Sequence, residues 1–319
     1  MQQLDVITFG EAMAMFIANQ PGPLHEINQY TLELAGAETN VAIGLTRLGV
    51  QSGWVSKVGN DAFGKFIINR LKEEKVDIQQ VIVDTNYPTG FQLKSKVTFG
   101  DPEVQYFRKG SAASNLGIDG FNEEYFLSAR HMHMTGIPLA LSSHTRAFAN
   151  HALALMKRNG RSISFDPNLR ANLWNSKEEM IQATNEMAFQ VNHVFPGIKE
   201  GDILTGYQEP YDIASFYLDK GVELVIIKLG EEGAFYKTQM EEGMVPGYEV
   251  QKVIDTVGAG DGFAVGVISG LLQGLPVHET VLRGNAIGAL AVQSPGDHSG
   301  YPTRSQLNDY MANHFQGVK

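Results

Sequence analysis

The stretch Val253-Ile-Asp-Thr-Val-Gly-Ala-Gly-Asp-Gly-Phe-Ala264 is the most informative part of the sequence. Its β-branched residues end at Ile254, glycines follow at positions 258, 260 and 262, and an apolar helical pattern begins at Phe263. We therefore predict a strand, a glycine-rich turn and a helix N-terminus. The first N–H groups of a helix have no partners inside it, and the helix dipole adds positive charge there, so such a turn suits an anion.

One acid, Asp261, stands inside this turn. A carboxylate repels a resting phosphate, so its presence calls for a reason. It could be a base that takes a proton from an attacking hydroxyl while the amides hold a phosphoryl group. It could equally be an acid that only caps the helix, which Asp does well. Spacing alone leaves both interpretations open.

Two common nucleotide motifs are excluded. The dinucleotide fingerprint needs G-x-G-x-x-G, but Phe263 or Val265 stands where its third glycine would be. The segment Gly59-Asn-Asp-Ala-Phe-Gly64-Lys65 follows the P-loop pattern up to its last position. There Phe66 replaces the hydroxyl that would bind magnesium. Neither motif is therefore predicted to hold a nucleotide.

The composition bounds the class of protein. The 319 residues are 43% hydrophobic and 19% charged, which is enough to bury a large core. A net charge of −10 disfavours nucleic acid or an anionic membrane as a partner. There is no cysteine, so disulfides and thiolate metal sites are absent. Early acids and short apolar runs predict no signal peptide and no membrane span, and we expect a cytoplasmic protein.

Strand and helix patterns alternate along the chain. Leu4–Phe9 is the first predicted strand, and the rhythm is most regular from Arg130 onward. Such alternation predicts parallel pairing with ligands at the carboxyl ends of strands. We therefore expect Asp166–Arg170, Lys228 and Asp261 to share one edge of the sheet.

Two segments, about 12–34 and 88–109, instead show β-ribbon patterns outside this rhythm. They are expected to form one small sheet that covers a site, or an added edge of the main sheet. Asn40 precedes the predicted helix Val41–Leu48. It could cap that helix or bind a ligand, and from the sequence alone capping is favoured.

Over essentially its whole length the chain resembles the ribokinase-like (PfkB) carbohydrate kinases. The resemblance rests on Asp255-Thr-Val-Gly-Ala-Gly-Asp261-Gly-Phe, and on Ala35-Gly-Ala-Glu-Thr-Asn40 through Gly59-Asn-Asp61-Ala-Phe-Gly64. It implies a single domain over residues 1–319, folded as a three-layer α/β/α sandwich with a mostly parallel central sheet and a small β lid. It also implies ATP with Mg²⁺ as phosphoryl donor and a sugar hydroxyl as acceptor.

The resemblance assigns roles to individual residues. The catalytic base falls on Asp261, and the anion hole on the backbone of Gly258, Ala259 and Gly260. Metal roles fall on Glu200, which would reach Mg²⁺ through water, and on Asp255, which matches the monovalent-cation loop of members that bind K⁺. The predicted nucleotide-binding residues are Lys228, Gly230, Gly233, Gly258, Gly260 and Asn285.

Two positions depart from the family pattern. The Gly-Gly hinge reads Ala35-Gly36, which makes lid closure costlier if it needs φ > 0 at the first position. The Asn-x-x-Glu segment tied to magnesium and phosphate reads Gly197-Ile-Lys-Glu200, so its asparagine is absent. These departures leave room for a catalytically silent sugar- or nucleotide-binding protein, against which an intact Asp261 turn argues.

The segments Pro88-Thr-Gly90, Tyr106-Phe-Arg108 and Asp166-Pro-Asn-Leu-Arg170 look most like the 2-keto-3-deoxygluconate kinase branch of the family, and this resemblance predicts the acceptor. That substrate carries a carboxylate, which arginine binds with a fork of donors that lysine lacks. Arg108 and Arg170 would hold the acid end while Asp261 faces the terminal hydroxyl, giving 2-keto-3-deoxy-6-phosphogluconate. The predicted substrate-binding residues are Gly36, Asn40, Tyr106, Arg108 and Arg170.

Other acceptors stay open. Fructokinases of the same family carry a similar Asp-Pro-Asn-x-Arg stretch, so fructose or another neutral sugar is the alternative, and a nucleoside is a more distant one. In those cases Arg170 would hold ATP phosphate and Arg108 would be a solvated lid charge. The alternating apolar faces of the lid segments also suggest a homodimer through the lids.

Overall fold

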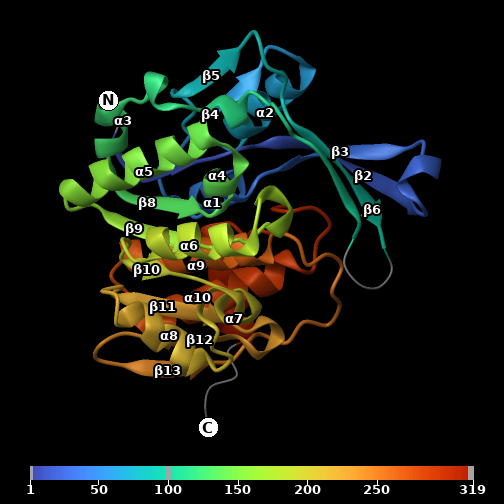
Figure 1. Cartoon of the computed structure of the whole chain (residues 1–319). Coiled ribbons are helices and arrows are strands. Elements are labelled where there is room, and N and C mark those ends of the chain that lie inside the picture. The colour runs from blue at the N-terminus through green and yellow to red at the C-terminus, as the bar shows by residue number, and fades with distance from the viewer. Residues whose placement is uncertain (1–2, 98–101, 315–319) are drawn as a thin grey trace.

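In the computed structural model, residues 3–97 and 102–314 are described, and within them strands form two sheets (Figure 1). The large sheet has the order β13-β12-β11-β10-β9-β8-β1-β4-β5. Its strands pair in parallel except β12, which is antiparallel to both of its neighbours. The strands are β1 (Leu4–Phe9), β4 (Ser52–Gly59), β5 (Val81–Asp84), β8 (Ala129–Thr135), β9 (Ser162–Asp166), β10 (His193–Val194), β11 (Leu224–Lys228), β12 (Ala234–Lys237) and β13 (Glu242–Val245).

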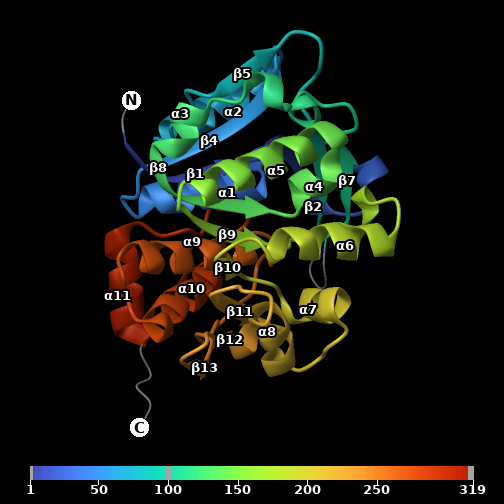
Figure 2. The ribbon, with the colours of Figure 1, turned by 60° about the vertical axis from the view of Figure 1, so that its left-hand side comes forward.

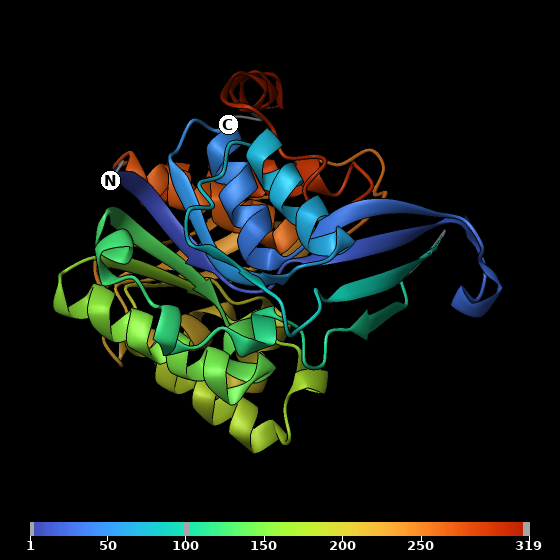
Figure 3. The same cartoon turned by 90° about the horizontal axis from the view of Figure 1, so that it is seen from above.

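Helices cover both faces of this sheet (Figure 3), so the predicted three-layer α/β/α architecture is confirmed. One face carries α3 (Glu123–Leu127), α4 (Ile137–Leu141), α5 (Ser143–Arg158), α6 (Lys177–Ala188), α7 (Ile198–Thr205) and α8 (Pro210–Leu218). The other carries α1 (Ala37–Arg47), α2 (Ala62–Glu73), α9 (Ala259–Leu272), α10 (Val277–Ala291) and α11 (Arg304–His314). Figure 2 shows α9, α10 and α11 packed beside one another.

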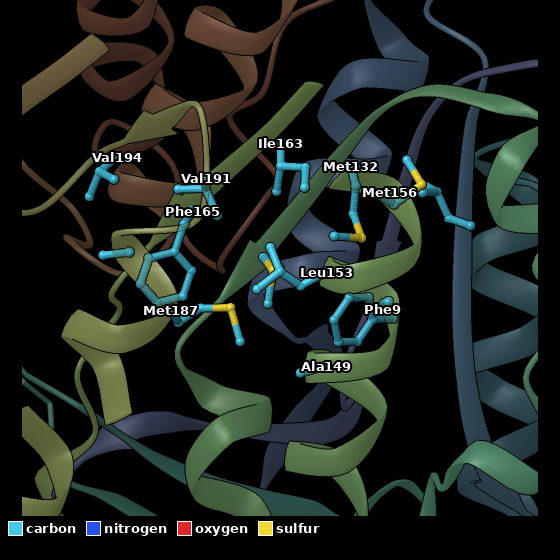
Figure 4. Close-up of a cluster of buried hydrophobic side chains, with 14 of the residues drawn as sticks. Phe9, Met132, Ala149, Leu153, Met156, Ile163, Phe165, Met187, Val191 and Val194 are labelled. Carbon is cyan, nitrogen blue, oxygen red and sulfur yellow. The ribbon is translucent and has the colours of Figure 1, made fainter. Parts of the chain in front are cut away.

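Alternation along the strands divides the core between these two faces. In β1, Ile7 and Phe9 pack under α5, whereas Val6 faces α1 and α9. Figure 4 shows Phe9, Leu153 and Phe165 in the cluster on the first side, where every labelled side chain is apolar. Successive side chains of a strand point to opposite faces, so one buried strand supplies both cores.

The lid is a separate sheet of four strands in the order β3-β2-β6-β7. It consists of β2 (Met13–Pro21), β3 (Tyr30–Ala35), β6 (Phe91–Lys96) and β7 (Val104–Phe107), and it extends from the body in Figure 1. β2 and β3, from segment 12–34, and β6 and β7, from segment 88–109, therefore pair in one small sheet rather than adding an edge to the large one. The sequence Gly100-Asp-Pro102 predicts a turn between β6 and β7, and its first two residues lie outside the described residues.

Two local predictions are wrong. Val253 and Ile254 form no strand; they are 57% and 50% exposed in a loop that Ile254 anchors by donating to the carbonyl of Val292. None of the strands in the described part of the chain pairs with them, so β-branched composition alone does not make a strand there. Asn40 is not a helix cap, because α1 already begins at Ala37 with Gly36 as N-cap.

The structure also shows why alanine can stand at position 35, the first position of the hinge. Ala35 ends β3 in ordinary extended backbone, and the positive φ of 151° falls on Gly36. A Cβ on Gly36 would lie 2.7 Å from the hydroxyl of Thr39, so only glycine suits this position.

In the described part of the chain, no helix combines the length and apolar character needed to cross a bilayer.

Candidate active site

A cavity of about 440 Å³ opens at the carboxyl edge of the large sheet, between the strand ends, the lid and the start of α9. Most of the predicted site residues line it: Gly36, Asn40, Tyr106, Arg108, Arg170, Glu200, Lys228, Gly258, Gly260 and Asp261. The predicted residues that do not line it are Gly230, Gly233, Asp255, Ala259 and Asn285.

The turn before α9 accepts only glycine at position 258. Gly258 has a φ of 82°, and a Cβ there would lie 1.7 Å from the carbonyl oxygen of Asp297. The hydroxyl of Tyr301 donates to the Gly258 carbonyl at 2.6 Å and fixes the turn from behind. The amide of Ala259 donates to the carbonyl of Thr256 at 3.4 Å. The amides of Gly260 and Asp261 lie in the first turn of α9, where a helix cannot supply their partners. This cradle fits a phosphate group.

Asp261 is buried in the same turn and does not cap it. It is the third residue of α9, and its carboxylate accepts hydrogen bonds from the side-chain amides of Asn40 at 2.8 Å and Asn168 at 3.3 Å. Burial raises the pKa of Asp261 to about 7, partly opposed by the Asn40 hydrogen bond and the charge of Arg170. A carboxylate with a pKa near 7 is suited to accept a proton at neutral pH.

Lys228 brings a cation to the turn. It ends β11, and its ammonium lies 2.5 Å from the carboxylate of Asp166 at the end of β9. Burial opposes its charged form, but Asp166 and Glu200 outweigh burial and raise the pKa of Lys228. A Cβ on Gly260 would be 3.5 Å from this ammonium, so a charged lysine stands beside the anion cradle.

Arg108 enters the cavity from the lid. Its Nε donates to the buried carboxylate of Glu11 at 2.6 Å, and Glu11 also accepts from the hydroxyl of Ser111. Its guanidinium stacks over Tyr106, 5.6 Å from the ring centre. Its terminal nitrogens have no hydrogen-bond partner among the described residues. Glu11 therefore fixes the arginine by one nitrogen and leaves its two-pronged end open.

Arg170 lies across the same cavity, after β9. It is exposed, its carbonyl accepts from the amide of Leu173 at 2.9 Å, and within residues 3–97 and 102–314 its side chain makes no hydrogen bond or ion pair. Its charge lowers the pKa of both Asp261 and Asp297, so it lies near both carboxylates. Arg108 and Arg170 thus both line this cavity with side-chain N–H groups that have no partner among the described residues.

The predicted nucleotide loop lies just beyond this cavity. Gly230 and Gly233 have φ values of 67° and 100°, and a Cβ on Gly233 would lie 2.1 Å from the carbonyl oxygen of Val245. Asn285, on α10, donates to the carbonyls of Val245 and Pro246 at 3.0 Å each. Its NH₂ group thereby ties α10 to the end of β13.

Glu200 links two loops at the cavity wall. One of its oxygens accepts from the amide of Leu169 and the other from that of Gly197, both at 2.8 Å. Gly197, where the family has asparagine, therefore supplies only a backbone donor. The described residues contain no group of three or more His, Cys, Asp or Glu side chains that could hold a metal. A metal at Glu200 would need ligands from water or substrate.

Asp255 is already paired with a cation from the chain itself. The ammonium of Lys94, on β6 of the lid, lies 2.6 Å from Asp255 and 3.5 Å from Asp297. Lys94 is buried, with 2% of its surface exposed. This arrangement does not fit a free monovalent cation at Asp255.

Sequence reasoning missed several residues of the site. Asn168 lies within the stretch Asp166–Arg170, which was predicted to reach this edge. Glu11 comes two residues after the end of the first strand, in a region where ligand-binding side chains are expected. No pattern in the sequence pointed to Asp297. The missed polar residues that line the cavity include Glu11, Gln92, Lys94, Asn168 and Asp297.

An anion cradle, a buried base and a lysine at one sheet edge define a small-molecule kinase. Residues 3–304 match the model of the pfkB family carbohydrate kinases, and the chain belongs to that family. It is a phosphotransferase with an alcohol group as acceptor. It is 53% identical to the 2-dehydro-3-deoxygluconokinase of Bacillus subtilis (strain 168), over 97% of this chain and 96% of that protein.

Solved structures agree in fold. A PfkB protein from Polaromonas sp. JS666 is 49% identical, with a TM-score of 0.89 over 96% of this chain and 99% of that one. An Escherichia coli protein described as a ribokinase II, solved with ATP and Mg²⁺, is 30% identical, with a TM-score of 0.90 over 98% and 100%. A double mutant of the Vibrio cholerae O395 fructokinase, solved with fructose, ADP and a potassium ion, is 27% identical, with a TM-score of 0.85 over 97% and 99%.

Proposed function

We propose that this kinase phosphorylates the terminal hydroxyl of 2-keto-3-deoxygluconate, giving 2-keto-3-deoxy-6-phosphogluconate, with ATP and Mg²⁺ as the donor. The observation that carries the proposal is the open end of Arg108, which Glu11 holds by Nε alone, in the same cavity as Asp261. The identity of 53% to a 2-dehydro-3-deoxygluconokinase supports the same substrate. Because ATP is the donor, we also propose a cytoplasmic location.

The acid end of the substrate would lie between Arg108 and Arg170. A guanidinium binds a carboxylate through two parallel hydrogen bonds, and Arg108 retains the terminal nitrogens for this. Tyr106 lies against Arg108 and would hold its plane. Gly36 and Asn40, from the start of α1, line the cavity and would contact hydroxyls of the sugar. A neutral sugar would leave the arginine fork without a partner.

Asp261 would accept the proton of the terminal hydroxyl as that oxygen attacks the γ-phosphorus. Its raised pKa, about 7, gives it proton affinity without protonating it fully at neutral pH. The amides of Gly258, Ala259, Gly260 and Asp261 would stabilise charge on the phosphoryl oxygens. Lys228 would add a positive charge beside them. Bound ATP with Mg²⁺ supplies the phosphoryl group and part of the charge that stabilises its transfer.

The nucleotide would lie along the carboxyl edge from Lys228 toward the loop Gly230–Gly233, with Asn285 holding the wall of that region. Mg²⁺ would be held through water by Glu200 and by the phosphates themselves, which is how this ion is usually bound. The lid formed by 12–34 and 88–109 would close over both substrates and exclude water. In this proposal residues 1–319 work as one domain.

The test compares acceptors directly. ATP consumption by the purified protein with Mg²⁺ is measured with 2-keto-3-deoxygluconate, gluconate, fructose, ribose and adenosine. We expect the highest kcat/KM for the keto-deoxy acid. A preference for fructose would overturn the substrate and assign the arginines to the lid or to ATP. ATP binding without turnover of any acceptor would favour a silent binding protein, which the intact Asp261 turn argues against.

A dimer through the lids is also part of the proposal. Leu32, Val97 and Phe107 are exposed apolar side chains of the lid segments. An exposed apolar sheet face is stabilised when a second copy covers it. Sizing chromatography with light scattering tests this directly, and Phe107→Ser should shift the protein toward the monomer. A monomer at all concentrations would contradict the proposal.

A further inference from the structure

A buried lysine connects the lid to the loops on either side of the anion cradle in the sequence. Lys94 lies in the middle of β6, between β2 and β7, and its ammonium reaches out of the lid to Asp255 and Asp297. Its side chain is 3% exposed and those of the two carboxylates are 13% and 7% exposed. Burying an ammonium this deeply costs much more than an exposed pair returns. Stabilisation of the lid therefore does not by itself explain why this lysine is buried.

The two carboxylates flank the turn that forms the cradle. Asp255 stands three residues before Gly258, and it accepts a hydrogen bond from the amide of Val257 at 3.1 Å. Asp297 presents the carbonyl that lies under Gly258, the position where a Cβ would overlap. Both residues thus set the shape of the turn that receives the phosphoryl group. Unneutralised, their negative charges would also repel that group.

We propose that Lys94 serves as a built-in monovalent cation for the phosphoryl-transfer turn. Its ammonium lies at Asp255, the residue to which the family resemblance assigns a free monovalent ion. The Vibrio cholerae fructokinase was solved with a potassium ion, so a related kinase does bind such an ion. This proposal rests on the kinase activity of the chain and is independent of which sugar is the acceptor.

Two consequences follow from placing this charge on the lid. The enzyme needs no potassium, because the ammonium of Lys94, a part of the polypeptide itself, supplies the positive charge at Asp255 and Asp297. The turn also has its neutralising charge only while β6 lies against it, so the position of the lid and the readiness of the turn are coupled. A free ion would neutralise the carboxylates whether the lid was open or closed.

The first experiment uses the unaltered protein. Activity and Tm are measured in choline chloride and in potassium chloride at equal ionic strength, because screening alone changes surface electrostatics. We expect the same kcat/KM and the same Tm in both salts. Activation by potassium together with a potassium-dependent rise in Tm would overturn the proposal. This arm needs no variant to fold.

The second experiment removes the ammonium of Lys94 and leaves Asp255 and Asp297 without a positive charge. In choline chloride, Lys94→Met should lower kcat/KM by about 5- to 150-fold, the usual range of coupling between two sites. Potassium or ammonium should restore much of the activity and raise the Tm, with saturation at the same ion concentration for both. Loss of activity with no response of either quantity to any small cation would overturn the proposal, because Lys94 would then be only a structural tether.

Two further variants complete the test. Lys94→Met combined with Asp255→Asn should lose the ion-dependent rise in Tm, because the carboxylate that holds the ion is gone. Lys96→Met is the matched control: Lys96 lies on the same strand, is exposed, and donates only to the carbonyl of Asn19 at 3.1 Å. It should show no response to the ion. If Lys94→Met refolds poorly in choline, a potassium-dependent refolding yield gives the same answer.

Discussion

The side-chain amide of Asn40, in the first turn of α1, donates a 2.8 Å hydrogen bond to the carboxylate of Asp261, in the first turn of α9. The two residues are 221 positions apart in the sequence. Two helix N-termini therefore meet at one carboxylate. Asn40 both holds Asp261 in place and favours its ionised form.

Asn40→Ala should shift the pH dependence of the reaction. Burial raises the pKa of Asp261 to about 7, and the Asn40 hydrogen bond lowers it, so removing that bond raises the pKa further. A base works only when deprotonated, so activity is present above its pKa and is lost as pH falls through it. A hydrogen bond to a charged group is worth about 1.5–3 kcal/mol, or about one to two pH units.

The measurement is the pH profile of kcat/KM for Asn40→Ala, which should move its acidic limb to higher pH. Thr46→Val, at the far end of the same helix, is the control and should keep the original profile. An unchanged limb in Asn40→Ala would mean that Asp261 is not the group whose ionisation the profile reports.

Asp261→Asn should lower kcat by about 10²- to 10⁴-fold, the usual contribution of a general base, and keep the fold. It should also raise stability above neutral pH. The native pKa of Asp261, about 7, exceeds its ordinary value of 3.8, so the unfolded chain binds fewer protons between these values and stability falls as pH rises.

The same variant therefore gives a second, independent readout. Its Tm should exceed that of the unaltered protein at pH 8.5 by about 2–4 °C per kcal/mol of penalty removed, and the gap should close at pH 4. Near-normal turnover would remove Asp261 from the mechanism. A Tm gap of equal size at both pH values would show that its charge is not the cause.

Arg108→Lys tests the carboxylate clamp. Lysine can still pair with Glu11 but has no fork, so kcat/KM for the keto-deoxy acid should fall by about 2 kcal/mol, or about 30-fold. Fructose, which lacks a carboxylate, should lose much less. Arg130→Lys, an exposed arginine paired with Asp5 away from the cavity, is the control. Equal losses for both sugars would argue against the clamp.

Gly258→Ala should abolish activity and lower the Tm. Its φ of 82° alone would strain alanine by about 1–2 kcal/mol, and the Cβ would also overlap the carbonyl of Asp297. Gly274→Ala separates these effects, because Gly274 has a φ of 67° and open space around its Cβ position. It should lose a little stability and no activity. Full activity in Gly258→Ala would contradict the role of the turn as an anion cradle.

The sequence predicted most of the fold, because the strands are buried on both faces and the helices are amphipathic. The first strand is predicted at Leu4–Phe9, where it lies. Short segments that lead into loops were predicted less well. Val253–Ile254 has strand composition, but a strand also needs a neighbour, and a partner cannot be seen in local sequence.

Site residues could be predicted where they lie within one local sequence motif. Asp261, Gly258 and Lys228 stand in recognisable turns after strands or before a helix. Asn40 was assigned to a cap because helix starts are uncertain by a few residues from sequence, and the structure begins α1 at Ala37. Glu11 and Lys94 were missed because their partners, Arg108 and Asp255, are far away in the chain. Pairing between distant charges leaves no periodic trace.

The parallel pairing of β2 with β6 has a consequence for the order in which the protein is assembled. Ala14 pairs with Phe91 and Ile17 with Lys94, so the lid joins strands separated by α1, β4, α2 and β5. Parallel strands cannot be closed by a tight turn, and contacts at long sequence separation form late. During refolding, amides of β6 should therefore gain protection from hydrogen exchange after those of β1 and β4. The last structure to form would be the one that completes the active site, so a chain with a finished core would still be inactive.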